Sequence, residues 1–160
     1  MLSNDILRRV RWALDLNDDK VRELFALSGK EIKGEDLKTM FKKEDDSGFV
    51  RCPDSLAHYF FRGLIIQMRG KQEGGEDKAI PAPGEFTNND ALWYLRIAMK
   101  LKDDDVLAIL KKVDVNISKG ELGAFFRKKG HDNYRPCGDQ FLRNFLAGFT
   151  AKYRGKPAEN

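Results

Sequence analysis

The sequence is poor in several features that would assign a protein to a special class. It has two cysteines and five prolines among its 160 residues, and two cysteines are too few for a disulfide framework. No apolar run approaches the roughly 20 residues needed to span a bilayer. The opening MLSNDILRRVRW mixes acids and bases without an apolar stretch, which argues against a signal peptide. We therefore expect a protein of the reducing cytoplasm.

What is present is the composition of a globular protein, with 41% hydrophobic and 34% charged residues. The net charge of +4 is distributed unevenly along the chain. Residues 3–70 carry 13 Lys and Arg against 12 Asp and Glu, whereas residues 88–155 carry 13 against 8. The segment 71–87 carries 2 against 4. The positive excess lies in the second half, which suggests an anionic partner for that half.

An internal repeat organises the chain. LNDDKVRELF at 16–25 recurs as LKDDDVLAIL at 101–110, and residues 3–70 align with 88–155 without a gap. More than a quarter of the aligned pairs are identical, where unrelated chains share roughly one in sixteen. The identities run from Asn4/Asn89 to Gly70/Gly155. The chain is therefore an internal duplication.

Each copy has the apolar spacing of four helices and no alternating strand pattern. In the first copy these helices are predicted near 4–15, 18–28, 34–43 and 53–68. The fold class expected is all-α, a tandem duplication of a four-helix module at 3–70 and 88–155. The Gly- and Pro-containing acidic segment 71–87 is the predicted linker. Because a core of about 70 residues is marginal alone, we expect the copies to pack as one compact unit around a pseudo-symmetric seam.

Three recurring motifs carry a resemblance to a known family. They are Asn4–Asp5–Leu7–Arg11, Leu16–Asp18–Asp19–Val21 and Cys52–Asp54–Gly63, each repeated 85 positions later. The pattern resembles the YehS-like bacterial proteins, a tandem-repeat domain of unknown function. The resemblance covers residues 3–155 and implies a cytoplasmic, all-helical, two-module protein. It implies no activity.

The repeated polar residues can be explained either by a structural role or by binding and catalysis. Asp18, Asp19, Asp103 and Asp104 precede apolar helical stripes, so we expect them to cap helix N-termini. A hard cation would need oxygens that converge from spaced positions. For Arg11 and Arg96 we expect ion pairs near Asp18 and Asp103, with phosphate contact as the alternative.

Cys52 and Cys137 precede the fourth helix of each copy, where a thiol can become reactive. We favour small buried thiols, because no base accompanies both. His58 and His131 do not align with each other, and they lack the paired spacing of a zinc site. Gly63 and Gly148 lie inside the fourth helices and are predicted to allow close helix packing.

The strongest partner-binding signal is a basic set in the second copy. Its members could bind phosphates or could be ordinary lysines that favour helix C-termini. Trp93 and Tyr94 replace Arg8 and Arg9 of the first copy, and we expect them to be covered by that copy or by a partner. The basic set is Lys111, Lys112, Lys119, Arg127, Lys128, Lys129 and Arg135.

No catalytic constellation, metal site or cofactor motif is visible in the sequence. The sequence favours a non-enzymatic interaction module that binds a protein or other macromolecule, with a protein partner ranked above nucleic acid. The alternative is nucleic-acid binding through the basic face of the second repeat. A membrane is not expected as a partner, and a monomer is favoured over an oligomer.

Overall fold

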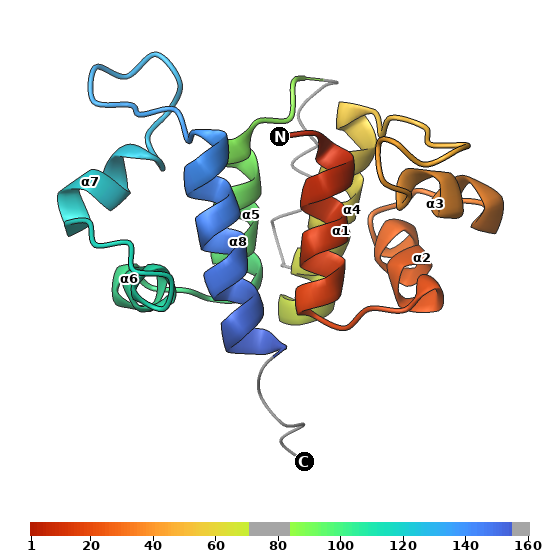
Figure 1. The fold of residues 1–160 in the computed structure, drawn as a ribbon, viewed down its shortest axis with the longest axis horizontal. Coiled ribbons are helices and arrows are strands. Elements are labelled where there is room, and N and C mark those ends of the chain that lie inside the picture. Colours follow the sequence, from red (N-terminus) through yellow and green to blue (C-terminus); the bar gives the residue numbers. More distant parts are fainter. Residues whose placement is uncertain (71–83, 155–160) are drawn as a thin grey trace.

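The computed structural model describes residues 1–70 and 84–154, and within them every regular element is a helix. The predicted all-α fold is thereby confirmed, with four helices in each repeat (Figure 1). The first repeat contains α1 (Ser3–Ala13), α2 (Asp18–Leu27), α3 (Gly34–Met40) and α4 (Asp54–Arg69). The second contains α5 (Asn88–Ala98), α6 (Asp103–Lys111), α7 (Lys119–Ala124) and α8 (Asp139–Tyr153).

The first and last helices of each repeat form the centre of the molecule. α1, α4, α5 and α8 lie together, with α2 and α3 outside them on one side and α6 and α7 on the other (Figure 1). The repeats meet along two seams, α4 against α5 and α1 against α8. These two seams are equivalent under the repeat, because α1 corresponds to α5 and α4 to α8. The copies therefore pack around a pseudo-two-fold axis.

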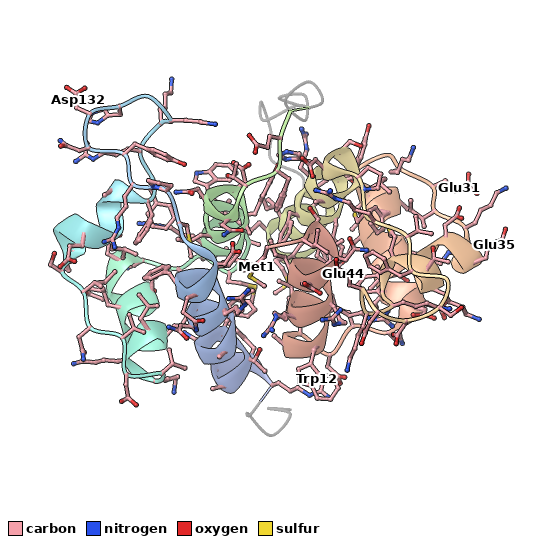
Figure 2. The ribbon with its side chains drawn as sticks, turned by 45° about the horizontal axis from the view of Figure 1, so that its top comes forward. Met1, Trp12, Glu31, Glu35, Glu44 and Asp132 are labelled. Atoms are coloured by element: carbon pink, nitrogen blue, oxygen red, sulfur yellow. The ribbon has the colours of Figure 1, made fainter. Side chains whose placement is uncertain are left out.

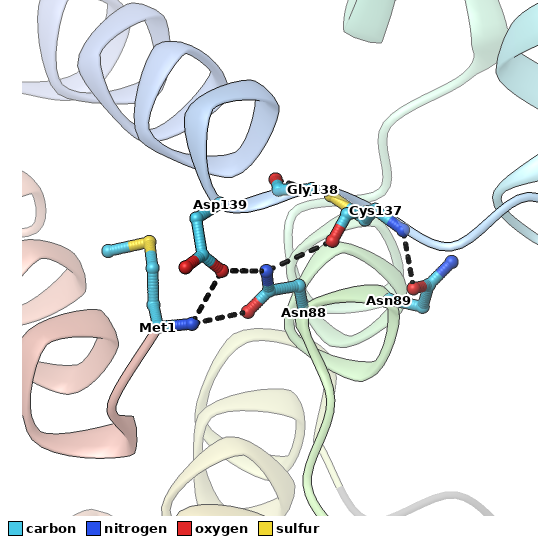
Figure 3. Close-up of polar contacts among 6 residues, drawn as sticks. All are labelled: Met1, Asn88, Asn89, Cys137, Gly138 and Asp139. Atoms are coloured by element: carbon cyan, nitrogen blue, oxygen red, sulfur yellow. Dashed lines mark hydrogen bonds and ion pairs between the residues drawn. The ribbon is translucent and has the colours of Figure 1, made fainter.

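All four central helices begin at the same end of the molecule. The terminal amine of Met1, just ahead of α1, donates to Asp139 Oδ1 at 2.7 Å and to Asn88 Oδ1 at 3.3 Å (Figure 3). The amide of Phe86, just ahead of α5, donates to Asp54 Oδ2 at 3.1 Å. Met1 and Phe86 are equivalent positions, as are Asp54 and Asp139, so one contact is made twice. Each repeat accepts a hydrogen bond from the other at its last helix.

The repeated acids begin helices, but they do not provide the N-cap hydrogen bonds. At α2 the cap is Asn17, whose Oδ1 accepts from the amide of Lys20 at 2.8 Å. Asp18 lies in the first turn and binds the guanidinium of Arg11 at 2.5 Å. The expectation that Asp18 caps α2 is therefore wrong, because that carboxylate is taken by the arginine. The negative charge of Asp18 still interacts favourably with the positive end of the helix dipole.

Other helix ends follow the sequence more directly. A capping box begins α7, where Ser118 Oγ accepts from the Glu121 amide at 3.1 Å and Glu121 Oε1 accepts from the Ser118 amide at 3.2 Å. Gly70 ends α4 with a φ of 78°, a conformation that glycine adopts freely. Gly155, its predicted counterpart, lies outside the described residues.

Within each repeat the fourth helix lies extremely close to the second. A Cβ placed on Gly63 would overlap the carbonyl oxygen of Leu24 in α2, and one on Gly148 would overlap that of Ile109 in α6. Only glycine leaves room for the two backbones. The prediction of close packing at both positions therefore agrees with the observed geometry.

At its C-terminal end, the predicted linker 71–87 packs against both repeats. Its residues 71–83 lie outside the described part of the chain, and the last few are part of the fold. Phe86 packs edge-on against Phe61 with ring centroids 5.5 Å apart. Thr87 is the N-cap of α5 and forms a capping box with Asp90. Phe86 therefore packs mainly against the first repeat, whereas Thr87 begins the first helix of the second.

Candidate binding site

The segment 125–137 of the second repeat, which contains Arg127, Lys128 and Lys129, is held in place by the side chain of Asn89. Asn89 Nδ2 donates to the carbonyls of Phe125 at 3.0 Å and Arg135 at 2.9 Å, and its Oδ1 accepts from the Cys137 amide at 2.8 Å. These three bonds tie both ends of the segment 125–137 to the start of α5. Asn4 makes the same three bonds in the first repeat, to Met40, Val50 and Cys52.

The fixed segment and α5 enclose a surface hollow of about 330 Å³. Trp93 contributes an indole that is 46% exposed. We call this the Trp93 hollow. Besides Trp93, its lining includes the three basic side chains Arg127, Lys128 and Lys129, the ring of Tyr134 and the acids Glu85 and Asp90. An exposed aromatic ring and three cations therefore share one concave surface.

The segment that carries these cations projects from the body of the molecule. Figure 2 shows Asp132 at its outer tip, away from the central helices. The tip is shaped by local bonds, with the His131 amide donating to the Lys128 carbonyl and Gly130 at a φ of 96°. The hollow lies beside the end where the four central helices begin, and an aspartate in the first turn of each helix offsets the positive end of its dipole.

Acidic groups offset part of this charge. Lys129 Nζ lies 3.8 Å from Glu85, and Arg135 lies 4.0 Å from Glu121 while covering the ring of Phe125. Exposed pairs of this kind contribute little to stability, so both basic groups stay available to a stronger anion. Arg127 and Lys128 make no ion pair among residues 1–70 and 84–154.

The structure divides the basic set that the sequence put together. Arg127, Lys128 and Lys129 line the Trp93 hollow, whereas Lys111, Lys112 and Lys119 do not. Lys119 instead pairs with Asp104 at 3.1 Å, near the start of α6. The three outlying lysines are exposed.

Trp93 and Tyr94 have opposite environments. Tyr94 is 5% exposed, stacks on Phe61 of α4 at 5.4 Å, and shares a 2.8 Å hydrogen bond with His58 Nδ1. Burial, together with Asp90, raises the pKa of Tyr94 to about 12, so the hydroxyl stays protonated. The first repeat thus covers Tyr94 and leaves Trp93 open. Nothing in the residue spacing separates these two neighbours, because the difference arises from packing between the repeats.

The remaining polar candidates are occupied in the fold. Arg11 lies 4.8 Å above the ring of Phe41 besides binding Asp18. Arg96 likewise lies 4.5 Å above Phe126 and 2.8 Å from Asp103. Both guanidiniums already have an anion and a ring, which leaves little to offer a phosphate.

The two thiols are buried, and their surroundings disfavour the thiolate. Burial, with a smaller effect of Asp54, raises the pKa of Cys52 to about 12. Burial and Asp139 raise the pKa of Cys137 to about 12 in the same way. A nucleophilic cysteine needs a lowered pKa, and these environments raise it.

Neither a metal-ligand cluster nor a membrane-spanning helix is found in the part of the chain that the structure describes. Over residues 1–70 and 84–154, no three of the His, Cys, Asp and Glu side chains lie close enough together to hold a metal ion. Over the same residues, no helix combines the length and apolar character needed to cross a bilayer.

Comparison with known proteins agrees with the duplication. The profile of a family described as a protein of unknown function, DUF1456, matches residues 3–70 and again 88–155. The uncharacterized protein YehS of Escherichia coli (strain K12) is 44% identical over 156 residues, which cover 98% of this chain and 99% of the relative. No solved structure matches significantly. The chain belongs to the DUF1456 family and contains two tandem copies of its domain, as the resemblance to YehS-like proteins predicted.

Proposed function

We propose that this protein is a non-enzymatic binding module and that the Trp93 hollow binds single-stranded nucleic acid. The observation that carries the proposal is the exposed indole of Trp93 in one hollow with Arg127, Lys128 and Lys129. Proteins that bind single strands combine a positive groove for the backbone with aromatic rings on which bases stack. The sequence alone ranked a protein partner first, because the aromatic member of this site was not recognisable from spacing.

Each part of the hollow has a distinct role in this proposal. The three cations are consecutive on an outward-projecting segment, so they can follow successive phosphates. Trp93 lies on the rigid helix α5 and offers its ring for one base, a contact worth about 1–3 kcal/mol. Asn89 joins the segment 125–137 to α5, the helix that also carries the indole.

A non-enzymatic role is supported by the state of the nucleophiles and bases. The thiols have raised pKa values, and His58 is enclosed in the seam at 4% exposure. Neither kind of group faces the Trp93 hollow. The second repeat alone carries the site, since Arg8 occupies the position of Trp93 in the first repeat.

Fluorescence anisotropy with a labelled single-stranded oligonucleotide tests the proposal. We expect the logarithm of the binding constant to fall with the logarithm of the salt concentration. The slope should be about −2, as three phosphate contacts on a single strand would give. The triple variant R127E/K128E/K129E should abolish binding, and Trp93→Ala should weaken it while Trp93→Phe retains most of it.

The matched control is K111E/K112E/K119E, which changes the net charge by the same amount in the same repeat outside the hollow. It should retain most of the affinity. Equal losses from both triple variants would show that only net charge matters, which contradicts the proposed site. Failure to bind at low salt would also contradict it, and an acidic protein partner would then remain.

A further inference from the structure

The two equivalent seams differ in how they are filled. In the α4–α5 seam, Tyr94 projects against α4 and stacks on Phe61. In the α1–α8 seam the position of Tyr94 is held by Arg9, which is exposed, and that of Phe61 by the smaller Leu146. The second seam therefore keeps a hollow where the first has an aromatic ring.

That hollow has a volume of about 510 Å³ and combines two chemistries. Leu146, Ala147 and Thr150 of α8 form one wall. Arg8, Arg9 and Trp12 of α1 form the other, and no acid is among the lining residues. The volume lies in the range of small-molecule pockets, about 300–1,000 Å³. We call it the Trp12 hollow.

Trp12 is fixed in an unusual position for a large apolar side chain. It is 59% exposed, and the guanidinium of Arg154 lies 3.3 Å from its ring centroid. Arg154 also donates to the Trp12 carbonyl at 2.7 Å and lies 3.3 Å from Asp15. The ring is thus held at the end of α1, where it closes the Trp12 hollow and a neighbouring one of about 370 Å³.

Arg8 provides a cation on the wall that the two neighbouring hollows share. It lines both hollows, and its Nη2 pairs with Asp5 at 3.0 Å. Its Nη1 is buried and has no hydrogen-bond partner among residues 1–70 and 84–154. The side chain as a whole is 31% exposed, so the accessible part of the guanidinium offers a positive charge to an anionic group in the Trp12 hollow.

We propose that the Trp12 hollow binds a small amphiphilic anion, with its phosphate or carboxylate group at Arg8 and Arg9. Its apolar body lies on Trp12, Leu146 and Ala147. The Trp12 hollow is distinct from the Trp93 hollow, because Trp12 and the segment tip at Asp132 lie at opposite ends of the molecule (Figure 2). The proposal therefore stands without the nucleic-acid site.

Dodecyl phosphate, titrated below its micelle concentration, is the probe that tests this site. The sequence has two tryptophans, so a Trp93→Phe background leaves Trp12 as the only indole reporter. We expect a saturable change in Trp12 emission with dodecyl phosphate. Inorganic phosphate, which lacks the tail, and dodecyltrimethylammonium, which has the opposite charge, should give none.

Two variants in that background locate the binding. Arg9→Tyr introduces a tyrosine at the position equivalent to Tyr94, which fills the α4–α5 seam. Ala147→Leu fills the hollow without removing an arginine. Each should weaken dodecyl phosphate binding at least about tenfold, a factor worth about 1.4 kcal/mol. Lys38→Tyr, on the exposed face of α3, makes the same chemical change as Arg9→Tyr elsewhere and should leave binding unchanged.

The outcomes are decisive in both directions. Saturable binding that both filling variants weaken supports the site. The proposal is overturned if monomeric dodecyl phosphate does not bind, or if it binds equally to both filling variants. Sedimentation with phosphatidate vesicles distinguishes the source of the ligand, since capture by vesicles without binding of the monomer would indicate a membrane surface and contradict a site for single molecules.

Discussion

The two seams between the repeats are built from equivalent helices and yet have different contents. The α4–α5 seam is closed by rings and the hydrogen bond between His58 and Tyr94. The α1–α8 seam carries an arginine at the tyrosine position and stays partly open. The two repeats therefore share the backbone arrangement and the hydrogen bonds of Asn4 and Asn89, while side chains at the seams differ. The paired positions are Tyr94/Arg9, Phe61/Leu146, Phe86/Met1 and His58/Arg143.

The largest expected effect tests what both repeats share. Gly63→Ala and Gly148→Ala would push α4 from α2 and α8 from α6, because the added Cβ meets a backbone carbonyl that cannot move alone. We expect each to lower the unfolding free energy by about 3 kcal/mol or more, with Gly63→Ala the worse. Urea denaturation followed by circular dichroism measures both.

Gly123→Ala is the control for those glycine variants. A Cβ added at this position in α7 would meet no atom within 4 Å, and alanine is the better helix former. The variant should be neutral or stabilising. A similar loss at all three positions would show that chain flexibility, and not helix contact, requires the glycines.

The next effect distinguishes the repeats at their asparagine clamps. Asn4 is 1% exposed, so Asn4→Ala leaves buried carbonyls and the Cys52 amide without partners, at a cost of about 2–3 kcal/mol. Asn89 is more accessible, and Asn89→Ala should cost less. Thermal melts of both variants measure the difference.

Asn89→Ala has a second expected result that Asn4→Ala lacks. Because Asn89 holds the segment that carries Arg127–Lys129, its loss should weaken oligonucleotide binding at the Trp93 hollow. Equal affinity in the two variants would separate the clamp from the binding surface.

A smaller effect is expected from the polar contact inside the closed seam. Tyr94→Phe keeps the stack on Phe61 and removes the hydroxyl that meets His58 Nδ1. Since His58 Nε2 already has no hydrogen-bond partner within the described residues, both ring nitrogens would then lack one. We expect a loss of about 1–2 kcal/mol by urea denaturation. Arg9→Ala, at the equivalent exposed position, should change stability by less than about 0.5 kcal/mol.

The smallest effect concerns the two carboxylates that join the repeats. Hydrogen bonds from the Met1 amine and Asn88 hold the pKa of Asp139 below its usual value near 3.8. Because the folded pKa is lowered, this contribution to stability is present above about pH 4 and is lost as the pH falls further. Asp139 is half exposed, so Asp139→Asn should cost under about 1 kcal/mol at pH 7.

Melting curves from pH 7 to pH 3 measure that contribution. The difference in Tm between the wild type and Asp139→Asn should shrink toward the acid end, and added salt should shrink it too. Asp54→Asn is the matched variant, in which the donor is the neutral amide of Phe86. A Tm difference for Asp139→Asn that is independent of pH would rule out the charge as its cause.

The architecture could be predicted from the sequence, because the spacing of apolar residues and the positions of glycines determine helices locally. The same spacing also occurs in both repeats. The four helices of each copy, the capping box at Ser118 and the end of α4 at Gly70 all follow from neighbouring residues. Family membership followed from the same recurring motifs. The family profile leaves residues 84–87 outside both repeats, and the packing of Phe86 on Phe61 of the first repeat is a contact that the linker pattern does not reveal.

The candidate sites could be predicted only in part, since they depend on which residues meet across the chain. The basic character of Arg127–Lys129 was visible in the sequence, whereas its proximity to Trp93 required the Asn89 clamp. Nothing in the sequence indicated the Trp12 hollow. The hollow is present because the first repeat has the exposed Arg9 where the second has the buried ring of Tyr94. The ion pair of Arg11 with Asp18 was expected, but Asp18 was also misread as the cap, which the preceding residue Asn17 provides.

The pairing of the first helix with the last has a consequence for biosynthesis. Arg154 and Trp12 are in contact although 142 positions separate them, and Met1 and Asp139 although 138 do. A chain that emerges from the ribosome can join α4 to α5 early, but α1 must wait for α8. The seam that holds the Trp12 hollow is therefore the last to form during translation.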